Sequence, residues 1–271
     1  MKGRVLVIAG SDSGGGAGVQ ADIKTITALD AFAMTAISAL TAQDTNGVSG
    51  IHDVPPAFVR KQMTVVLADL GADAIKTGML HTPAVIDAVV ETLQETNTGA
   101  PLVVDPVMSA KSGDSLISSE ATDTLVRRLI PMATVLTPNL PEASILVGRP
   151  IQSVADMEAA RDDLMALGAT HVLLKGGHLV GDHVKDLLFG PGETRSFESS
   201  RIDTKHTHGT GCTLASAIAA GLAQGLGIEQ SIARARDYVL EAIRTAPGFG
   251  AGHGPMNHSH TVSAPRPPRR D

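Results

Sequence analysis

Short apolar segments that contain almost no polar residue are the feature that most constrains the fold of this chain. Longer segments, whose apolar residues recur at helical spacing, run between them. A strand that is apolar at every position has both faces buried, and such strands occur mainly in parallel sheets covered by helices on both sides. The alternation therefore predicts an α/β fold with a mostly parallel central sheet.

The strands and helices follow from these patterns. The predicted parallel strands are residues 4–9, 34–42, 74–77, 102–105, 134–137 and 171–175. The alanine content of 34–42 leaves a helix open as the alternative. Segments 184–189 and 193–197, joined by Gly190-Pro191-Gly192, are typical of a hairpin at a sheet edge. Helical stripes predict helices in residues 19–29, 58–70, 85–93, 122–130, 153–167, 214–224 and 229–245.

The length of the chain is compatible with one domain. It has 271 residues, and large α/β sheets often form single domains of about 200–250 residues. The sequence contains no internal repeat and no linker-like stretch before the Pro- and Arg-rich end. We expect one domain over residues 1–263 and a disordered tail over residues 264–271.

Composition excludes several classes of function. The net charge is −6 and the only basic cluster lies in the tail, which argues against a nucleic-acid partner. No apolar run approaches the roughly 18 residues of a membrane span, and the N-terminus lacks a secretory signal. A single cysteine, Cys212, rules out an internal disulfide and is typical of a reducing compartment. We expect a soluble, cytoplasmic protein that contacts neither membranes nor nucleic acid.

Polar loops follow one predicted strand after another. Ligands of such sheets bind at the carboxyl ends of the strands. Each loop there carries charged or amide side chains beside Gly or Pro, which predicts the polar rim of an active site. The loops are residues 10–18, 43–47, 76–79, 105–108, 137–142 and 175–178.

The first of these loops imitates a dinucleotide-binding motif. Residues 16–21 satisfy G-x-G-x-x-G/A, and an acidic residue, Asp44, follows the next predicted strand. In a true fingerprint the glycines form the tight turn directly after the strand, whereas Gly16 lies several residues beyond it. The loop also lacks the Gly-Lys-Ser/Thr of a Walker A motif. A nicotinamide-dependent oxidoreductase therefore remains an alternative function, supported only by this weak match.

A stronger phosphate-binding signal lies near the C-terminus. Gly209, Thr210, Gly211 and Cys212 open the predicted helix 214–224. Glycines before a helix let backbone N–H groups converge on an anion that the helix dipole also favours. We predict a phosphate cradle there, with Cys212 beside the anion. The alternative is that Gly211 and Thr213 only cap the helix.

The remaining loops supply the other parts of a phosphoryl-transfer site. Such a site needs a cradle, a cation, charge neutralisation and an aimed hydroxyl group. Asp105 and Glu142 are suited to hold a metal ion, and Lys175 offers a positive charge where phosphates would lie. Each could singly be an ordinary surface charge, but their joint position at strand ends favours a kinase that uses ATP.

With these segments the chain resembles the hydroxymethylpyrimidine/phosphomethylpyrimidine kinases of thiamine biosynthesis, in the ribokinase-like superfamily. The resemblance runs from about residue 4 to residue 258 in the order of the family. It rests on segments 9–22, 76–80, 104–108, 137–143, 174–178 and 208–213. It implies a three-layer α/β/α fold, a homodimer, and an ATP- and Mg²⁺-dependent kinase. The product would be first the phosphate and then the diphosphate of 4-amino-5-hydroxymethyl-2-methylpyrimidine.

The resemblance also implies roles for single residues. Gly10 and Ala17 would help form the pyrimidine site, where Asp22 and Gln43 bond the amino-pyrimidine edge. Apolar walls would come from Met79 and Val107. The catalytic set would be Cys212, Lys175, Gly209 and Gly211, the nucleotide would contact Asn139, Lys175, Thr210 and Gly211, and the metal would be held by Asp105 and Glu142. Many related sugar kinases have an Asp base where this chain has Cys212.

Some features depart from this picture or leave alternatives open. Asp44 stands where the family commonly has Asn, which leaves its role undefined. The nearest alternative is a pyridoxal or pyridoxine kinase, or an enzyme that accepts both rings. A non-catalytic pyrimidine sensor is a further alternative, against which Cys212, Lys175 and Glu142 argue. We interpret the histidines as solvated loop residues rather than metal ligands, namely His206, His208, His253, His258 and His260.

Overall fold

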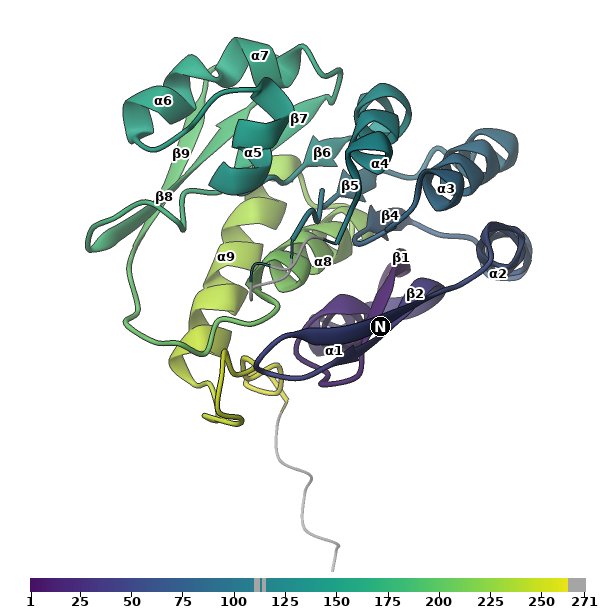
Figure 1. Ribbon diagram of the computed structural model, residues 1–271, viewed down its shortest axis with the longest axis horizontal. Coiled ribbons are helices and arrows are strands. Elements are labelled where there is room, and N and C mark those ends of the chain that lie inside the picture. The colour runs from purple at the N-terminus through teal and green to yellow at the C-terminus, as the bar shows by residue number, and fades with distance from the viewer. Residues whose placement is uncertain (110–112, 114–115, 263–271) are drawn as a thin grey trace, which may run out of the picture.

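The computed structural model describes residues 1–109, 113 and 116–262, and these form a nine-stranded sheet in the order β3-β2-β1-β4-β5-β6-β7-β8-β9 (Figure 1). Neighbours from β2 to β7 pair in parallel, while β3, β8 and β9 add antiparallel strands at the two edges. The strands are β1 (Arg4–Asp12), β2 (Phe32–Gln43), β3 (Val48–Asp53), β4 (Ala74–Thr77), β5 (Leu102–Val104), β6 (Val135–Leu136), β7 (His171–Leu174), β8 (His183–Phe189) and β9 (Arg195–Ser200). This confirms the mostly parallel α/β sheet and the edge hairpin. The tail predicted over residues 264–271 lies outside the described residues.

Helices cover both faces of the sheet, as Figure 1 shows. One layer contains α1 (Gly18–Ala28), α8 (Thr210–Ala223) and α9 (Ile228–Arg244). The other contains α2 (Pro56–Asp69), α3 (Pro83–Thr96), α4 (Ser119–Thr124), α5 (Leu140–Val147), α6 (Val154–Ala159) and α7 (Arg161–Met165). None of the described helices is long and apolar enough to cross a membrane.

The strand β1 shows why residues 5–9 are apolar at every position. Leu6 and Ile8 belong to the core under α2, α3 and α4, whereas Val5 and Val7 belong to the core under α1, α8 and α9. All four side chains have 0% exposure. Successive side chains of a strand point to opposite faces, so a strand between two helical layers has no polar face.

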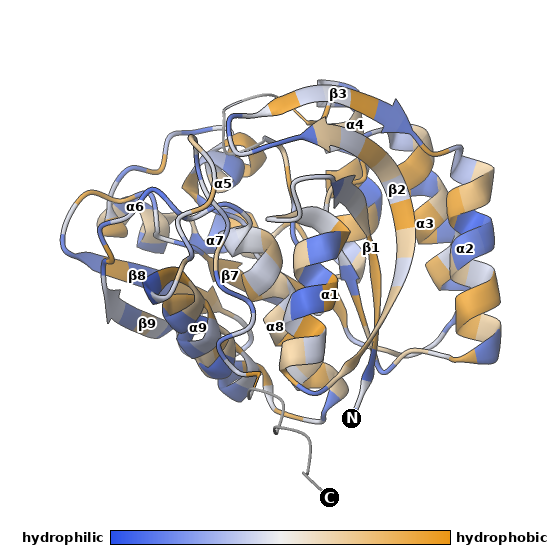
Figure 2. Ribbon diagram, turned by 90° about the horizontal axis from the view of Figure 1, so that it is seen from below, coloured by the Kyte–Doolittle hydropathy of each residue, from blue (hydrophilic) through white to orange (hydrophobic). Residues whose placement is uncertain are grey.

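The sheet edge at β3 was not predicted. Its residues are exposed or half-buried, so burial left no apolar pattern in the sequence. The strand is held by antiparallel backbone pairing to β2 instead. Figure 2 shows β2 and β3 as a curved ribbon at this edge. The helix alternative for 34–42 is wrong, because this segment pairs with β1 on one side and β3 on the other.

Three helical segments differ from expectation. The predicted helix 122–130 begins as α4 and continues as a wider π-helical turn, Leu125–Leu129, before a short 3-10 turn that contains Pro131. The predicted helix 153–167 divides into α6 and α7 at Ala160, where φ is −83° and ψ is −4°. A separate helix, α5, begins inside the loop predicted over 137–142.

Candidate functional site

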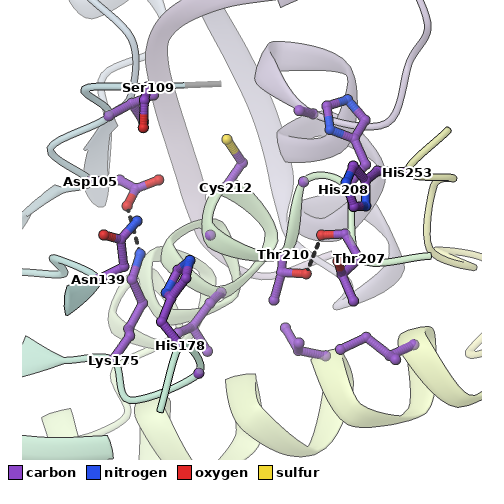
Figure 3. Close-up of a pocket in the computed structure, with 18 of the residues that line it drawn as sticks. Asp105, Ser109, Asn139, Lys175, His178, Thr207, His208, Thr210, Cys212 and His253 are labelled. Atoms are coloured by element: carbon purple, nitrogen blue, oxygen red, sulfur yellow. Dashed lines mark hydrogen bonds and ion pairs between the residues drawn. The ribbon is translucent and has the colours of Figure 1, made fainter. Parts of the chain in front are cut away.

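A cavity of about 760 Å³ lies at the carboxyl ends of the parallel strands, between the loops that follow them and one face of α9. All but one of the residues predicted to form the site line it. They are Gly10, Ala17, Gln43, Met79, Asp105, Val107, Asn139, Glu142, Lys175, Gly209, Thr210, Gly211 and Cys212. In Figure 3 the Cys212 side chain lies between Asp105 and Lys175 on one side and His208 on the other. Strand ends far apart in sequence are therefore brought to one space, although the role of each residue stays a prediction.

Asp22 is the exception, and its predicted contact with a pyrimidine edge is wrong. Its side chain is fully buried on α1 and does not line the cavity. The carboxylate accepts hydrogen bonds from the Lys76 ammonium at 2.9 and 3.0 Å and from the Ser216 hydroxyl at 2.7 Å. Its oxygens are occupied within the core, so they cannot reach a substrate.

The Gly-rich loop after β1 is organised by the carboxylate of Asp12. Its Oδ1 accepts from the Gly14 N–H at 2.8 Å, and its Oδ2 accepts from Gly16 at 3.0 Å and Ala17 at 2.8 Å. Gly18 has a φ of +56°, and a Cβ there would lie 2.4 Å from the Gly10 oxygen. The glycines therefore serve close packing of the loop on its own strand. The dinucleotide-like spacing follows from that packing.

His208 joins this loop to the predicted phosphate cradle. Its Nε2 lies 2.8 Å from Asp12 Oδ2, with the two side chains 10% and 2% exposed. Burial alone would raise the pKa of Asp12, but the His208 contact and the N–H groups of Ala17 and Gly14 outweigh it, so the pKa is lowered. The interpretation as a solvated loop residue is wrong for His208 and also for His258, because both are buried. Nothing in the sequence indicated the distant carboxylate.

The cradle forms where α8 begins. Gly209 is the N-cap with a φ of +82°, and a Cβ there would lie 1.8 Å from the Gly16 oxygen, so only glycine fits. No side chain caps this helix end. The Thr210 N–H donates to the Thr207 carbonyl at 3.3 Å, which leaves the N–H groups of Gly211 and Cys212 for another partner. The Thr210 hydroxyl donates to the Thr207 carbonyl at 2.6 Å, which fixes the turn (Figure 3). The cap-only interpretation of Gly211 and Thr213 is not supported, since the cap is Gly209.

Lys175 and Asp105 form the charged end of the cavity. The Lys175 Nζ lies 3.1 Å from Asp105 Oδ1, which also accepts from the Thr137 hydroxyl at 3.1 Å. Burial alone would lower the pKa of Lys175, but Asp105 and Glu142 outweigh it and the pKa is raised. A Cβ on Gly211 would lie 3.3 Å from this Nζ and 3.6 Å from Asp105 Oδ2. The cradle thus faces a lysine that stays positively charged.

Glu142 and Asn139 form a reciprocal capping box at the start of α5. Asn139 Oδ1 accepts from the Glu142 N–H at 2.9 Å, while Glu142 Oε2 accepts from the Asn139 N–H at 2.8 Å. Burial raises the pKa of Glu142 to about 7, because Lys175 offsets only part of the desolvation and Asp105 adds repulsion. Two buried carboxylates that face one cavity fit a divalent cation, which would relieve this repulsion.

No group of three or more His, Cys, Asp or Glu side chains that could hold a metal is found among the described residues. A cation at Asp105 and Glu142 would therefore need further oxygen ligands from elsewhere. This fits Mg²⁺, which is usually held by one or two carboxylates together with water and the phosphates of a substrate.

Burial controls the thiol of Cys212. It raises the pKa to about 12, although Lys76 acts in the opposite direction and the Gly18 N–H donates to the sulfur. A helix N-terminus favours a thiolate, so the outcome of this competition was open from the sequence. In this fold the desolvation of the thiolate outweighs the favourable effect of the helix N-terminus.

One wall of the cavity was not predicted. It consists of the α9 residues Arg236, Val239, Leu240 and Ile243. Arg236 pairs with Asp186, and Asp186 accepts from the Gly176 N–H at 2.8 Å, directly after Lys175. The sequence predicted α9 as a helix, but periodicity does not say which face turns to a cavity.

Comparison with known proteins places this geometry among vitamin kinases. A family model described as phosphomethylpyrimidine kinase matches residues 12–257. The chain is 47% identical over 256 residues to the hydroxymethylpyrimidine/phosphomethylpyrimidine kinase of Bacillus subtilis, which covers 94% of each chain. It is 51% identical over 257 residues to the thiamine biosynthesis bifunctional protein ThiED of Geobacter sulfurreducens. That match covers 95% of this chain and 52% of the relative, so the chain spans about half of the bifunctional protein.

Solved structures show the same fold. The ADP complex of Bacillus subtilis pyridoxal kinase has a TM-score of 0.88 at 36% identity, covering 96% of this chain and 98% of that one. Phosphomethylpyrimidine kinase from Clostridium difficile 630 has a TM-score of 0.79 at 41% identity, covering 89% and 100%. The fold is therefore shared by kinases that are named for two different rings.

Proposed function

The chain belongs to the phosphomethylpyrimidine kinase family, and from this membership we propose the reaction of its cavity. The γ-phosphoryl group of ATP passes to the hydroxymethyl group of 4-amino-5-hydroxymethyl-2-methylpyrimidine and then to the resulting monophosphate, in thiamine diphosphate biosynthesis. The observation that carries the proposal is that one cavity joins the open N-terminus of α8 to Cys212, Lys175 and Asp105. Such a set offers an anion cradle, a proton acceptor and two opposite charges for phosphoryl transfer.

The phosphates of ATP lie at the start of α8. The N–H groups of Gly211 and Cys212 face the transferring phosphoryl group, and the Lys175 ammonium neutralises charge that develops on its oxygens. Asp105 and Glu142 hold Mg²⁺, which supplies further charge neutralisation when it is bound. Asn139 positions Glu142 through the capping box and contacts the nucleotide.

The pyrimidine lies at the other end, between the loop after β1 and the end of β2. The apolar side chains of Met79 and Val107 flank it, and Gln43 bonds its polar edge. Gln43 Nε2 lies 3.5 Å from His208 Nε2, so the edge that recognises the ring is continuous with the Asp12–His208 pair. Cys212 accepts the hydroxymethyl proton as the oxygen attacks phosphorus.

The protein acts as a homodimer in the cytoplasm. The edge strand β3 leaves one row of backbone groups unpaired by other described strands, and Leu40 and Ile51 nearby are 45% and 37% exposed. Such an edge is suited to pairing with a second chain. The use of ATP and of a free thiol is consistent with a reducing, ATP-rich compartment.

Phosphorylation of pyridoxal is the second candidate, favoured by the likeness to pyridoxal kinase at a TM-score of 0.88. A coupled ADP-release assay with hydroxymethylpyrimidine, its monophosphate and pyridoxal tests both functions. We expect the highest kcat/KM on the two pyrimidines. A higher value on pyridoxal would assign the chain to that ring, and no ADP release with any of them would contradict the kinase.

Gln43→Ala is expected to raise the KM for the pyrimidine about tenfold and leave the KM for ATP unchanged. A substrate edge that loses one buried hydrogen bond typically costs about 1–3 kcal/mol. Gln62→Ala is the matched control, because the Gln62 side chain also bonds to β2, donating to the Ile37 carbonyl at 3.1 Å, but does not line the cavity. Steady-state kinetics with each substrate varied decides. A raised ATP KM with a normal pyrimidine KM would reverse the assignment of the two ends.

Stability without Mg²⁺ is expected to fall as pH rises towards 7. The pKa of Glu142 is raised from its ordinary value of 4.5 to about 7 in the folded protein, so the folded state holds a proton that the unfolded state releases. Its stabilising contribution is present at low pH and is lost as pH rises through the folded pKa. Mg²⁺ should therefore raise the melting temperature more at about pH 8 than at about pH 6.

Thermal scans with and without Mg²⁺ at both pH values measure this effect. In Glu142→Gln, where nothing titrates at this position, the Mg²⁺-induced gain should become small and independent of pH. An equal gain in parent and variant would place the cation elsewhere.

A further inference from the structure

Lys76 and Asp22 form a buried ion pair that the proposed reaction does not use. Both side chains are 0% exposed, as is that of Ser216, which donates to the same carboxylate. None of the three lines the cavity. A buried pair is weak evidence for stability, because desolvation of the two ions offsets most of their attraction. The pair, however, lies next to the Cys212 thiol in the fold.

Two helices bring the pair next to Cys212. Gly18 and Asp22 are one turn apart on α1, and Cys212 and Ser216 are one turn apart on α8. Residues at this spacing lie on the same face of a helix. The Gly18 N–H donates to the Cys212 sulfur, and the Ser216 hydroxyl donates to Asp22 at 2.7 Å. Helices α1 and α8 therefore make two adjacent contacts, one between Gly18 and Cys212 and one between Asp22 and Ser216. The ion pair lies at the second contact, one helical turn from the thiol.

A glycine leaves room for the ammonium. A Cβ on Gly78 would lie 2.9 Å from the Lys76 Nζ and 3.1 Å from the Ala9 Cβ. The first distance is shorter than real contacts allow, so a side chain there would displace the lysine. Lys76 and Gly78 thus form one unit at the end of β4, which holds the positive charge close to α8.

The charged groups that act on the thiol come from four elements. Lys76 at β4 and Lys175 after β7 are positive, and Asp22 on α1 and Asp105 after β5 are negative. Lys175 and Asp105 line the cavity, so ATP and a cation change their surroundings at each turnover. Lys76 and Asp22 are sealed in the core and do not line the cavity, so bound substrates do not contact them. They are the fixed part of the electrostatic environment of Cys212.

We propose that Lys76 and Asp22 are positioning residues that set the ionisation of the Cys212 thiol, with Lys76 favouring the thiolate and Asp22 opposing it. The effect on the thiol is independent of the substrate. Its consequence for turnover rests on the proposed function. There the thiolate takes the hydroxyl proton, the hydroxyl oxygen bonds to the γ-phosphorus, and the bond from phosphorus to the bridging oxygen breaks and leaves ADP with that electron pair.

Alkylation by iodoacetamide tests the inference on the free protein. The chain has a single cysteine, so loss of free thiol reports Cys212 alone, and the reagent is uncharged. Only the thiolate reacts. We expect Lys76→Met to slow alkylation about tenfold, and Asp22→Asn to accelerate it about tenfold, across about pH 7 to 10. Opposite signs are the signature, since a structural defect would open the core in both variants.

Ser216→Ala is the matched control, because it removes a hydrogen bond to Asp22 and leaves both charges in place. Its alkylation rate should stay within about twofold of the parent, since a neutral contact contributes far less than a charge. Thermal unfolding and circular dichroism establish that each variant is folded. Alkylation in denaturant corrects for the intrinsic reactivity of the thiol.

The double variant Lys76→Met/Asp22→Asn keeps the test decisive if either single variant fails to fold. It leaves no uncompensated charge in the core. Lys76 is the stronger of the two influences on the thiol, so the folded double variant should react more slowly than the parent. A parental rate in the double variant, or single variants that change the rate in the same direction, would overturn the inference. Shifted alkylation with unchanged kcat would instead contradict Cys212 as the proton acceptor, and leave the assignment of the pair intact.

Discussion

Lys175→Met is expected to lower kcat by about 10²–10³-fold and to raise the KM for ATP. The Lys175 ammonium lies 3.1 Å from Asp105 and faces the cradle at Gly211. Removing one preorganised charge or donor from the place where transition-state charge develops typically costs this much. Positive charge also offsets the buried carboxylates of Asp105 and Glu142. Without it the γ-phosphoryl group would enter a cavity end that is negative.

Control variants separate charge from folding. Lys175→Met leaves the Asp105 carboxylate buried without its partner, which can cost about 3–5 kcal/mol, so kcat is measured below the melting temperature of the variant. Lys185→Met is the matched control, because Lys185 forms an ion pair with Glu198 at 3.2 Å on the neighbouring hairpin but does not line the cavity. Lys175→Arg should recover part of the loss. Parental kcat in folded Lys175→Met would assign charge neutralisation to the metal and the helix end alone.

Cys212→Ala is expected to lower kcat by about 10²–10⁴-fold while ATP binding survives, because proton acceptance contributes about this factor. The cradle N–H groups belong to the backbone and are kept in the variant. Cys212→Asp, which restores an oxygen base, should lose less. Isothermal titration with a non-hydrolysable ATP analogue and steady-state kinetics measure the two effects separately.

The pH dependence of the parent gives a second measure of the same role. Burial raises the pKa of Cys212 to about 12, so the thiolate fraction, and with it kcat, should rise with pH over the neutral and mildly alkaline range. A carboxylate at this position is already ionised there, so Cys212→Asp should show a flatter profile. An Ala variant with parental kcat would leave Cys212 as a packing residue and shift catalysis to Lys175, the metal and the cradle.

Local sequence patterns were sufficient for the main elements of the fold. The buried parts of predicted strands, such as residues 5–9 and 172–174, are apolar at every position because two helical layers cover them. The glycines before α8 indicated an open helix end. The patterns did not predict a strand that is not buried, or a helix break that leaves the apolar spacing unchanged. β3 is exposed and lacks an apolar face, and Ala160 divides a helix whose apolar spacing continues across the break.

The partners of single side chains depend on tertiary structure. The amino-acid sequence by itself determined the alternation of strands and helices and the residues that meet at the strand ends, because a period of two or 3.6 residues records which side of an element is buried. It contained no record that Asp22 would pair with Lys76, 54 residues away, or His208 with Asp12, 196 residues away. The same holds for the α9 wall and for the ionisation of Cys212. Each of these depends on distances between elements and on the loss of water around a charge, and both quantities exist only after the layers have packed.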